Sequence, residues 1–118
     1  MANNIIITGA NQGIGYYMVE KLLAEGNKVS VLDIETDNLT NLQKNYDGLI
    51  FYKVDLRNYD EVKRAVDETV AEFDTIDIAV HNACKCTFES ESKTDLDTYK
   101  DVFDVNYFGA LRLVKCVI

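Results

Sequence analysis

The chain has 118 residues, enough for one domain built around a single hydrophobic core. Hydrophobic residues make up 47% of it, which predicts a folded globular protein and excludes a disordered one. The formal net charge of −8 argues against binding to nucleic acids or to anionic membrane surfaces, because both require a basic face.

The cysteines and the N-terminus favour a reducing compartment. Residues 1–4 have no basic side chain of the kind that opens a secretion signal, and no stretch approaches the ~18 apolar residues of a membrane span. The chain has three cysteines, Cys84, Cys86 and Cys116. Because an odd number cannot all pair within one chain, reduced thiols are expected, and with them a cytoplasmic protein. Cys84 and Cys86 are too close for the usual C-x-x-C metal hairpin, and the single histidine, His81, cannot complete a zinc site with them. We therefore expect no metal site.

Short apolar runs alternate with segments of helical period along the chain. We predict strands at residues 5–8, 28–33, 49–54 and 76–81. We predict helices at residues 14–25, 37–46, 59–73 and 96–118, the last a single long helix that buries much of its surface. The polar stretch at residues 84–93 has no period and is predicted to be a loop. Strands separated by helices predict a parallel sheet with right-handed crossovers.

Local signals refine the helices. The apolar stripe of the first helix is predicted to begin at Ile14. Asn58 followed by Glu61 predicts a capping box before the third helix, and Thr94 followed by Asp97 predicts another before the last. The buried stripe of the third helix is predicted to comprise Val62, Ala65, Val66, Thr69, Val70 and Phe73.

The segment from Thr8 to Gly15 joins the first predicted strand to the first predicted helix and reads Thr-Gly-Ala-Asn-Gln-Gly-Ile-Gly. Glycines let the backbone turn tightly and approach a ligand. The helix N-terminus offers unpaired N–H groups and a partial positive charge. A side chain at Gly13 or Gly15 would occupy the place of a pyrophosphate or of the packing helix. The turn therefore predicts a phosphate site, although its G-x-x-x-G-x-G spacing differs from the common G-x-G-x-x-G.

Asp33 is a candidate for recognising a ribose. It lies at the end of the second predicted strand, eighteen residues after Gly15. A carboxylate near this offset accepts hydrogen bonds from an adenosine ribose. It would also repel a 2′-phosphate, and neither Arg nor Lys follows within several residues to neutralise one. NAD is therefore expected in preference to NADP. The alternative is an ordinary aspartate that ends a strand or caps a helix.

Five motifs in order resemble the short-chain dehydrogenase/reductase family, and the resemblance covers essentially the whole chain. The first two are the glycine turn and Asp33. Asp55-Leu56 resembles the pair that contacts the adenine ring. Residues 81–84 are similar to the Asn-Asn-Ala-Gly that follows the fourth strand of the family. Val105-Asn106, followed by Gly109, resembles the long-helix signature that carries the first member of the catalytic tetrad. The resemblance implies cofactor-binding roles for Gly9, Asn11, Gly13, Ile14, Gly15, Asp33, Ile34, Asp55, Leu56, Asn82, Ala83 and Cys84.

The family's fold is a Rossmann-type doubly wound parallel sheet. For residues 1–118 the resemblance implies one partial domain of the α/β class. It has about four strands in the order 3-2-1-4, flanking helices and a long C-terminal helix. The fourth strand would then be an edge. Because residues 76–80 are mostly apolar, we expect pairing with a second copy of the chain through this edge, the long helix, or both.

Two departures from the family bear on activity. His81 and Cys84 replace an asparagine and a glycine, and the thiol could crowd the cofactor. The family's serine and Tyr-x-x-x-Lys would lie beyond the end of this chain. The two Tyr-x-x-x-Lys matches present, at Tyr17 and Tyr59, are expected by chance and neither is placed to face a nicotinamide.

Asn106 alone supplies neither acid nor base. We expect NAD binding without turnover by these residues. The alternatives are a non-catalytic nucleotide-binding or protein-interaction module and an enzyme that borrows catalytic groups from another chain.

Overall fold

Strands and helices alternate along residues 2–118, which the computed structural model describes. The strands are β1 (Asn4–Thr8), β2 (Lys28–Asp33), β3 (Leu49–Lys53) and β4 (Ile78–His81). The helices are α1 (Gly13–Ala24), α2 (Asp37–Gln43), α3 (Tyr59–Phe73), α4 (Leu96–Phe103) and α5 (Gly109–Val117). A 3-10 turn, η1 (Glu91–Lys93), interrupts the loop after β4, and a π-helical turn, η2 (Asp104–Phe108), joins α4 to α5.

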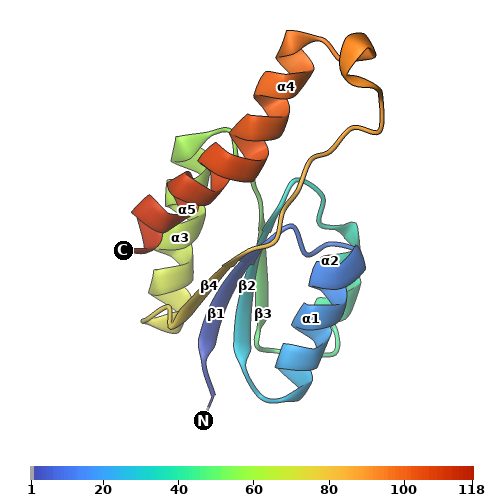
Figure 1. Cartoon of the computed structure of the whole chain (residues 1–118). Helices are drawn as coiled ribbons and strands as arrows, with labels where there is room; N and C mark the ends of the chain where they lie inside the picture. The colour runs from blue at the N-terminus through green and yellow to red at the C-terminus, as the bar shows by residue number, and fades with distance from the viewer. Residues whose placement is uncertain (1) are drawn as a thin grey trace.

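The strands form one parallel sheet in the order β3-β2-β1-β4, which confirms the predicted topology. β1 lies in the interior: Ile6 is opposite Ser30 of β2 on one side and Ala79 of β4 on the other. Helices α1 and α2 cover one face of the sheet, and α3 and α5 cover the other (Figure 1). The chain winds from β1 through β2 to β3 over one face and then passes to β4 over the other, so the sheet is doubly wound, and a crevice opens at the carboxyl ends of its strands.

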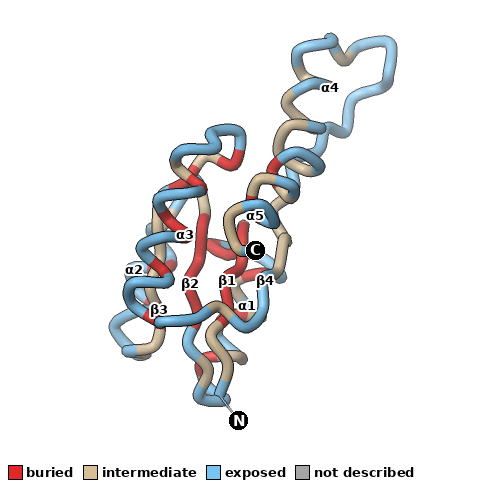
Figure 2. The backbone as a smooth tube through the Cα atoms, turned by 90° about the vertical axis from the view of Figure 1, so that its left-hand side faces the viewer, coloured by how far each residue is buried: buried red, intermediate tan, exposed pale blue. Residues whose placement is uncertain are grey.

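Neighbouring residues of the central strands point into two separate hydrophobic cores. Ile7 and Val31 pack beneath α1 and α2, whereas Ile6 and Leu32 pack beneath α3 and α5, together with Leu113. All five are buried, and Figure 2 shows β1 and β2 as the most continuously buried part of the chain. Fully burying one such side chain stabilises the fold by about 1.5–3 kcal/mol, so these two faces anchor the strand ends that carry the site.

The buried faces of two helices differ from the prediction by one position each. Ile14 is 79% exposed, and the buried stripe of α1 starts at Gly15 and continues through Val19 and Leu23. Glycine at this position brings the first turn of α1 close to the sheet, which leaves Ile14 outside the core. Val70 of α3 is 42% exposed, whereas the other five residues of the predicted stripe, Thr69 among them, are buried.

The predicted caps are partly correct. Asn58 caps α3 through its side-chain oxygen, which accepts a hydrogen bond from the Glu61 backbone N–H at 3.2 Å. At α4 the capping residue is Asp95, not Thr94, and its carboxylate accepts from the Thr98 N–H at 2.8 Å. The helix begins at Leu96, so Thr94 lies one residue too early to reach the unpaired N–H groups.

The predicted long C-terminal helix is present, but it contains a π turn. The N–H of Gly109 donates to the carbonyl of Asp104, five residues earlier. A Cβ at Gly109 would lie 3.2 Å from the Cβ of Leu56, so glycine permits a close crossing of this helix over the end of β3. α5 packs beside α3, while α4 extends past the sheet (Figures 1 and 2).

The prediction that this long helix buries much of its surface is wrong for the described residues. In α4 no residue is fully buried, and in α5 only Gly109 and Leu113 are. No helix within residues 2–118 is both long enough and apolar enough to cross a membrane.

Replacing Asn58 with alanine is expected to lower the free energy of unfolding by about 1 kcal/mol, because an N–H at the start of α3 loses its partner. Chemical denaturation monitored by circular dichroism measures this change. Thr36 is the matched control: it occupies the same position before α2 but makes no side-chain capping bond. Thr36→Ala should change the free energy by less than ~0.5 kcal/mol. Equal losses for the two variants would contradict the assigned cap.

Candidate functional site

A groove of about 590 Å³ opens at the carboxyl ends of the strands. Its volume lies within the range of roughly 300–1,000 Å³ that is typical of small-molecule and cofactor sites. Of the twelve residues predicted to bind a cofactor, the structure brings eight together in its walls: Gly9, Asn11, Asp33, Ile34, Asp55, Leu56, Ala83 and Cys84. The other four, Gly13, Ile14, Gly15 and Asn82, do not line it.

The three glycines of the turn have different roles. A Cβ on Gly9, which has φ +71°, would lie 2.5 Å from the Cα of Ala83. A Cβ on Gly15 would lie 2.5 Å from Nδ2 of Asn82. Both glycines therefore allow the turn to pack against the end of β4. Gly13 also has a positive φ, +64°, but a Cβ there would meet no atom within 4 Å. The backbone is thus open to a ligand at the residue where α1 begins, which suits a phosphate group.

The Thr8 hydroxyl ties the glycine turn to the segment after β4. Its oxygen accepts hydrogen bonds from the backbone N–H groups of Asn82 and Ala83, each at 3.1 Å. The side chain of Asn82 donates from Nδ2 to the Gly9 carbonyl at 2.8 Å. Asn82 therefore supports the floor of the groove from behind.

Asn11 holds α2 against the turn. Its Oδ1 accepts from the backbone N–H groups of Asn38 and Leu39, at 3.0 and 3.2 Å, and its Nδ2 donates to the carboxylate of Asp37 at 2.8 Å. This hydrogen bond lowers the pKa of Asp37 below its ordinary value. Asn11 is 4% exposed and its side-chain amide is occupied, so it shapes the groove as a scaffold.

Asp33 sits at the end of β2 with acceptor capacity to spare. One carboxylate oxygen accepts from the Asn11 N–H and the other from the Glu35 N–H, both at 2.9 Å. Each oxygen of an ionised carboxylate has two lone pairs, so each can still accept a hydroxyl proton. Glu35 lines the same part of the groove and adds a second carboxylate that sequence reasoning did not single out.

Two cations in the groove wall were also missed. Arg57 binds the carboxylate of Asp55 at 2.8 Å and reaches Asp101 of α4 at 3.1 Å, while Lys85 lies 3.5 Å from Asp101. The hydrogen bonds from Arg57 hold the pKa of Asp55 below its ordinary value. A signal was present in the sequence, because Arg57 follows Asp55 by two residues. Such exposed pairs each contribute at most ~1 kcal/mol, so they orient groups more than they stabilise the fold.

Asn106, the residue matched to the family's catalytic tetrad, lies in the π turn and is bonded on both sides to one residue. Its Oδ1 accepts from the backbone N–H of Lys85, and its Nδ2 donates to the Lys85 carbonyl, each at 2.7 Å. The side chain thereby fixes the loop that carries the exposed thiols of Cys84 and Cys86 beside the groove. An amide bonded in this way neither gives nor takes a proton.

The two Tyr-x-x-x-Lys matches lie away from the groove. Tyr17 is on the exposed side of α1, with the Lys21 ammonium 5.9 Å from its ring. Tyr59 begins α3, and the neighbouring thiol of Cys116 raises its pKa. Neither tyrosine lines the groove.

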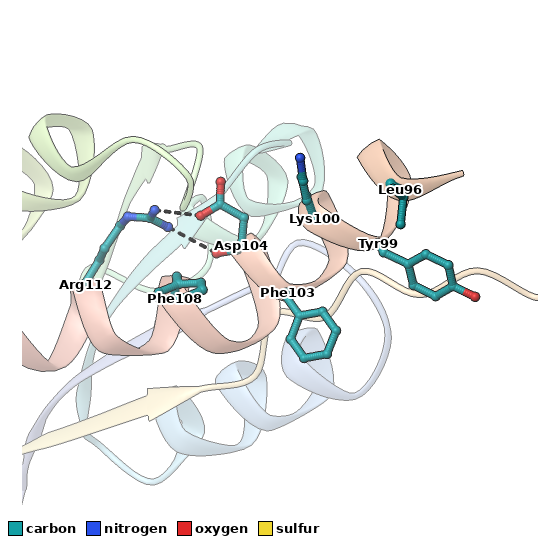
Figure 3. A pocket seen from close by; sticks show the side chains of 7 residues that line it. All are labelled: Leu96, Tyr99, Lys100, Phe103, Asp104, Phe108 and Arg112. Carbon is teal, nitrogen blue, oxygen red and sulfur yellow. Dashed lines mark hydrogen bonds and ion pairs between the residues drawn. The ribbon is translucent and has the colours of Figure 1, made fainter. Parts of the chain in front are cut away.

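A second hollow, of about 500 Å³, lies along α4 and the start of α5 (Figure 3). Its lining is Leu96, Tyr99, Lys100, Phe103, Asp104, Phe108 and Arg112. Arg112 donates to the Asp104 carboxylate at 2.6 Å and to the carbonyls of Asp104 and Leu56. This residue therefore fastens the π turn to the end of β3.

Two solved structures share this arrangement. The 3-ketoacyl-(acyl-carrier-protein) reductase from Brucella melitensis complexed with NADH superimposes with a TM-score of 0.92 at 22% identity, over 98% of this chain and 48% of that protein. The NADPH-bound carbonyl reductase from chicken fatty liver superimposes with a TM-score of 0.90 at 20% identity, over 98% of this chain and 47% of that protein. At these identities the likeness shows the fold.

Sequence comparison gives the family. The chain is 30% identical over 120 residues to the cis-2,3-dihydrobiphenyl-2,3-diol dehydrogenase of Paraburkholderia xenovorans (strain LB400), a match that covers 97% of this chain and 43% of the relative. The chain thus spans less than half the length of these proteins. The family model described as short chain dehydrogenase matches residues 3–118. By fold and by sequence, this chain belongs to the short-chain dehydrogenase family.

Proposed function

We propose that the groove binds NAD(H), with the pyrophosphate at Gly13 and the adenosine between Asp33 and Asp55. The observation that carries the proposal is the open, positive-φ backbone of Gly13 at the start of α1. A helix N-terminus with unpaired N–H groups attracts phosphate, and nothing from the protein fills the space in front of it. The spare lone pairs of Asp33 suit the ribose hydroxyls.

NAD is proposed in preference to NADP because the ribose end of the groove is acidic. Asp33 and Glu35 both line it, and a 2′-phosphate beside them would meet two carboxylates. Arg57 and Lys85 could attract a phosphate, but both are paired with Asp55 or Asp101. Binding a 2′-phosphate through them would require breaking those pairs.

In the family, hydride passes between a nicotinamide and an alcohol or carbonyl carbon, and a positioned acid or base moves a proton. We propose that the whole protein takes part in this class of reaction. We further propose that residues 1–118 hold the cofactor without turning it over on their own. The support is the state of Asn106, whose amide is bonded at both ends to Lys85. Proton transfer needs a titratable group within hydrogen-bond reach of the substrate.

A second copy of the chain is proposed to cover the apolar surface beside the groove. β4 is an edge strand, and its Ile78 is 42% exposed. Phe103 and Phe108, on the long helix, are also exposed and line the hollow in Figure 3. An exposed apolar edge invites pairing. If the groove proves not to bind a nucleotide, this surface favours the alternative of a protein-interaction module.

The free cysteines support a cytoplasmic location, which we also propose. Cys84 and Cys86 are exposed and unpaired, and Cys116 is free. Exposed thiols persist in compartments that keep cysteine reduced.

Gly13→Trp is expected to abolish saturable NADH binding, because the indole would fill the space in front of α1. Isothermal titration calorimetry of the purified chain measures the dissociation constant. Gly26→Trp is the matched control: Gly26 also has a positive φ, +92°, and open surroundings, but follows the far end of α1. It should bind NADH like the unmodified chain. The absence of binding by the unmodified chain at millimolar NADH would contradict the proposal and favour the interaction module.

Asp33→Asn is expected to weaken NADH binding and to narrow the preference for NADH over NADPH by on the order of tenfold. The amide keeps the size of the side chain but removes its charge and some acceptor capacity. Titrations of both cofactors into both proteins measure the four dissociation constants. Unchanged affinities and an unchanged ratio would show that Asp33 does not contact the ribose.

Ile78→Lys is expected to shift the chain from dimer or larger assembly toward monomer, because a charge on the β4 edge opposes strand pairing. Light scattering at tens of micromolar protein measures the mass. Val70→Lys is the control, since Val70 is also 42% exposed but lies on α3. A monomeric unmodified chain would contradict the proposed assembly. A dimer unaffected by Ile78→Lys would move the contact to the long helix.

A further inference from the structure

We propose that His81 is a positioning residue whose neutral ring holds the glycine turn in place, so that protonating His81 weakens cofactor binding. The proposal rests on the proposed binding of NAD(H) in the groove. His81 is the last residue of β4 and the single histidine of the chain. It does not line the groove, so any effect on the cofactor must pass through the residues it contacts.

The hydrogen bonds at Thr8 determine which nitrogen of His81 carries the proton. A hydroxyl has two acceptor lone pairs and one proton to donate. Both lone pairs of the Thr8 oxygen are occupied by the backbone N–H groups of Asn82 and Ala83. The remaining partner of Thr8 is Nδ1 of His81 at 3.0 Å. Thr8 must therefore donate to Nδ1, which has to be unprotonated, and the neutral ring carries its hydrogen on Nε2.

The surroundings of Nε2 disfavour a positive charge on the ring. It is buried and has no hydrogen-bond partner among residues 2–118. Burial lowers the pKa of His81 below its ordinary value, and the nearby backbone of Asn106 offsets part of that effect. Both observations favour the neutral ring.

Charged groups on the neighbouring elements do not change this balance. β1 and α5 pack against β4, and β1 has no ionisable side chain. The ionisable residues of α5 and of the π turn are Arg112, Lys115, Cys116, Asp104 and Tyr107. None of them contributes to the shift in the pKa of His81, and Arg112 is bonded to Asp104.

A second proton on the ring is incompatible with the bonds at Thr8. Nδ1–H would point at an oxygen whose lone pairs are both in use, and the Thr8 proton would lose its acceptor. For Nδ1–H to keep Thr8 as its partner, one bond from Asn82 or Ala83 has to give way. Both residues support Gly9: Asn82 donates to its carbonyl, and Ala83 packs where a Cβ of Gly9 would lie. Loosening them disturbs the turn that leads to Gly13.

The direction of the pH dependence follows from the lowered pKa. Above the unfolded-state pKa of about 6.5 the ring is neutral in both states, and its contribution to stability is complete. As the pH falls below that value, the unfolded chain takes up the proton first. Stability is therefore lost between the unfolded pKa and the lower folded pKa. Binding of NADH should weaken as the folded protein itself protonates, by up to about tenfold per pH unit.

The experiment compares the unmodified chain with His81→Asn, whose side-chain oxygen can accept from Thr8 and does not titrate. Calorimetric dissociation constants for NADH are measured from pH 5 to pH 8. We expect the unmodified chain to lose affinity in the acidic half of this range and His81→Asn to lose much less. Carboxylates titrate similarly in both proteins, so the difference isolates His81. Identical pH profiles would overturn the proposal.

A second measurement needs neither the variant nor the cofactor. Because the chain has one histidine, a long-range ¹H–¹⁵N spectrum reports its ring without assignment. At pH 8 we expect an unprotonated Nδ1 and a protonated Nε2; the opposite tautomer would overturn the proposal. Absence of NADH binding at every pH would overturn the proposed function and this coupling together. Binding with the opposite tautomer would overturn the coupling alone.

Discussion

The groove depends on the close contact between the glycine turn and the segment after β4. Gly9 and Gly15 leave no room for a Cβ because Ala83 and Asn82 occupy that space. The Thr8 hydroxyl then joins the turn to the segment after β4, because its oxygen accepts from the backbone N–H groups of Asn82 and Ala83. With this contact in place, α1 begins close to β1 and leaves Gly13 in open surroundings at its first turn. A larger residue at either packed glycine would separate α1 from the sheet and alter every wall of the site.

The polar side chains of the site divide into those that build it and those left free to bind. The side-chain amide of Asn11 forms hydrogen bonds with the backbone of α2, and that of Asn106 forms hydrogen bonds with the backbone of Lys85. Asp33 retains unused acceptor capacity at the rim, and Asp55 is shared with Arg57. The family resemblance points to all four, but only the hydrogen bonds separate scaffold from ligand contact. The amides of Asn11 and Asn106 hold neighbouring segments in place, whereas the carboxylate of Asp33 lies in the groove wall with acceptor positions still open.

Prediction from sequence succeeded where local patterns carry the information. The short apolar runs defined the strands, and the glycine turn located the first strand-to-helix crossing. It failed at single-residue register, as at Ile14 and Thr94, because one position around a helix is a difference of about 100° that apolar spacing resolves poorly. It also missed Arg57 as a groove cation, since its partner Asp101 lies on a distant helix. Pairing across that separation follows from the approach of α4 to the loop between β3 and α3, which no local pattern encodes.

The sequence by itself determined the α/β class, which follows from the alternation of strand and helix periods. The strand order and the residues expected to meet a nucleotide came from the resemblance of its motifs to the family. The tertiary structure alone decided which of those residues face the groove and which form hydrogen bonds or packing contacts behind it. It also decided that Nδ1 of His81 lies within hydrogen-bond distance of the Thr8 hydroxyl while its Nε2 is buried. Those outcomes depend on how many donors and acceptors meet at one point in space, which is a property of packed elements and not of any one segment.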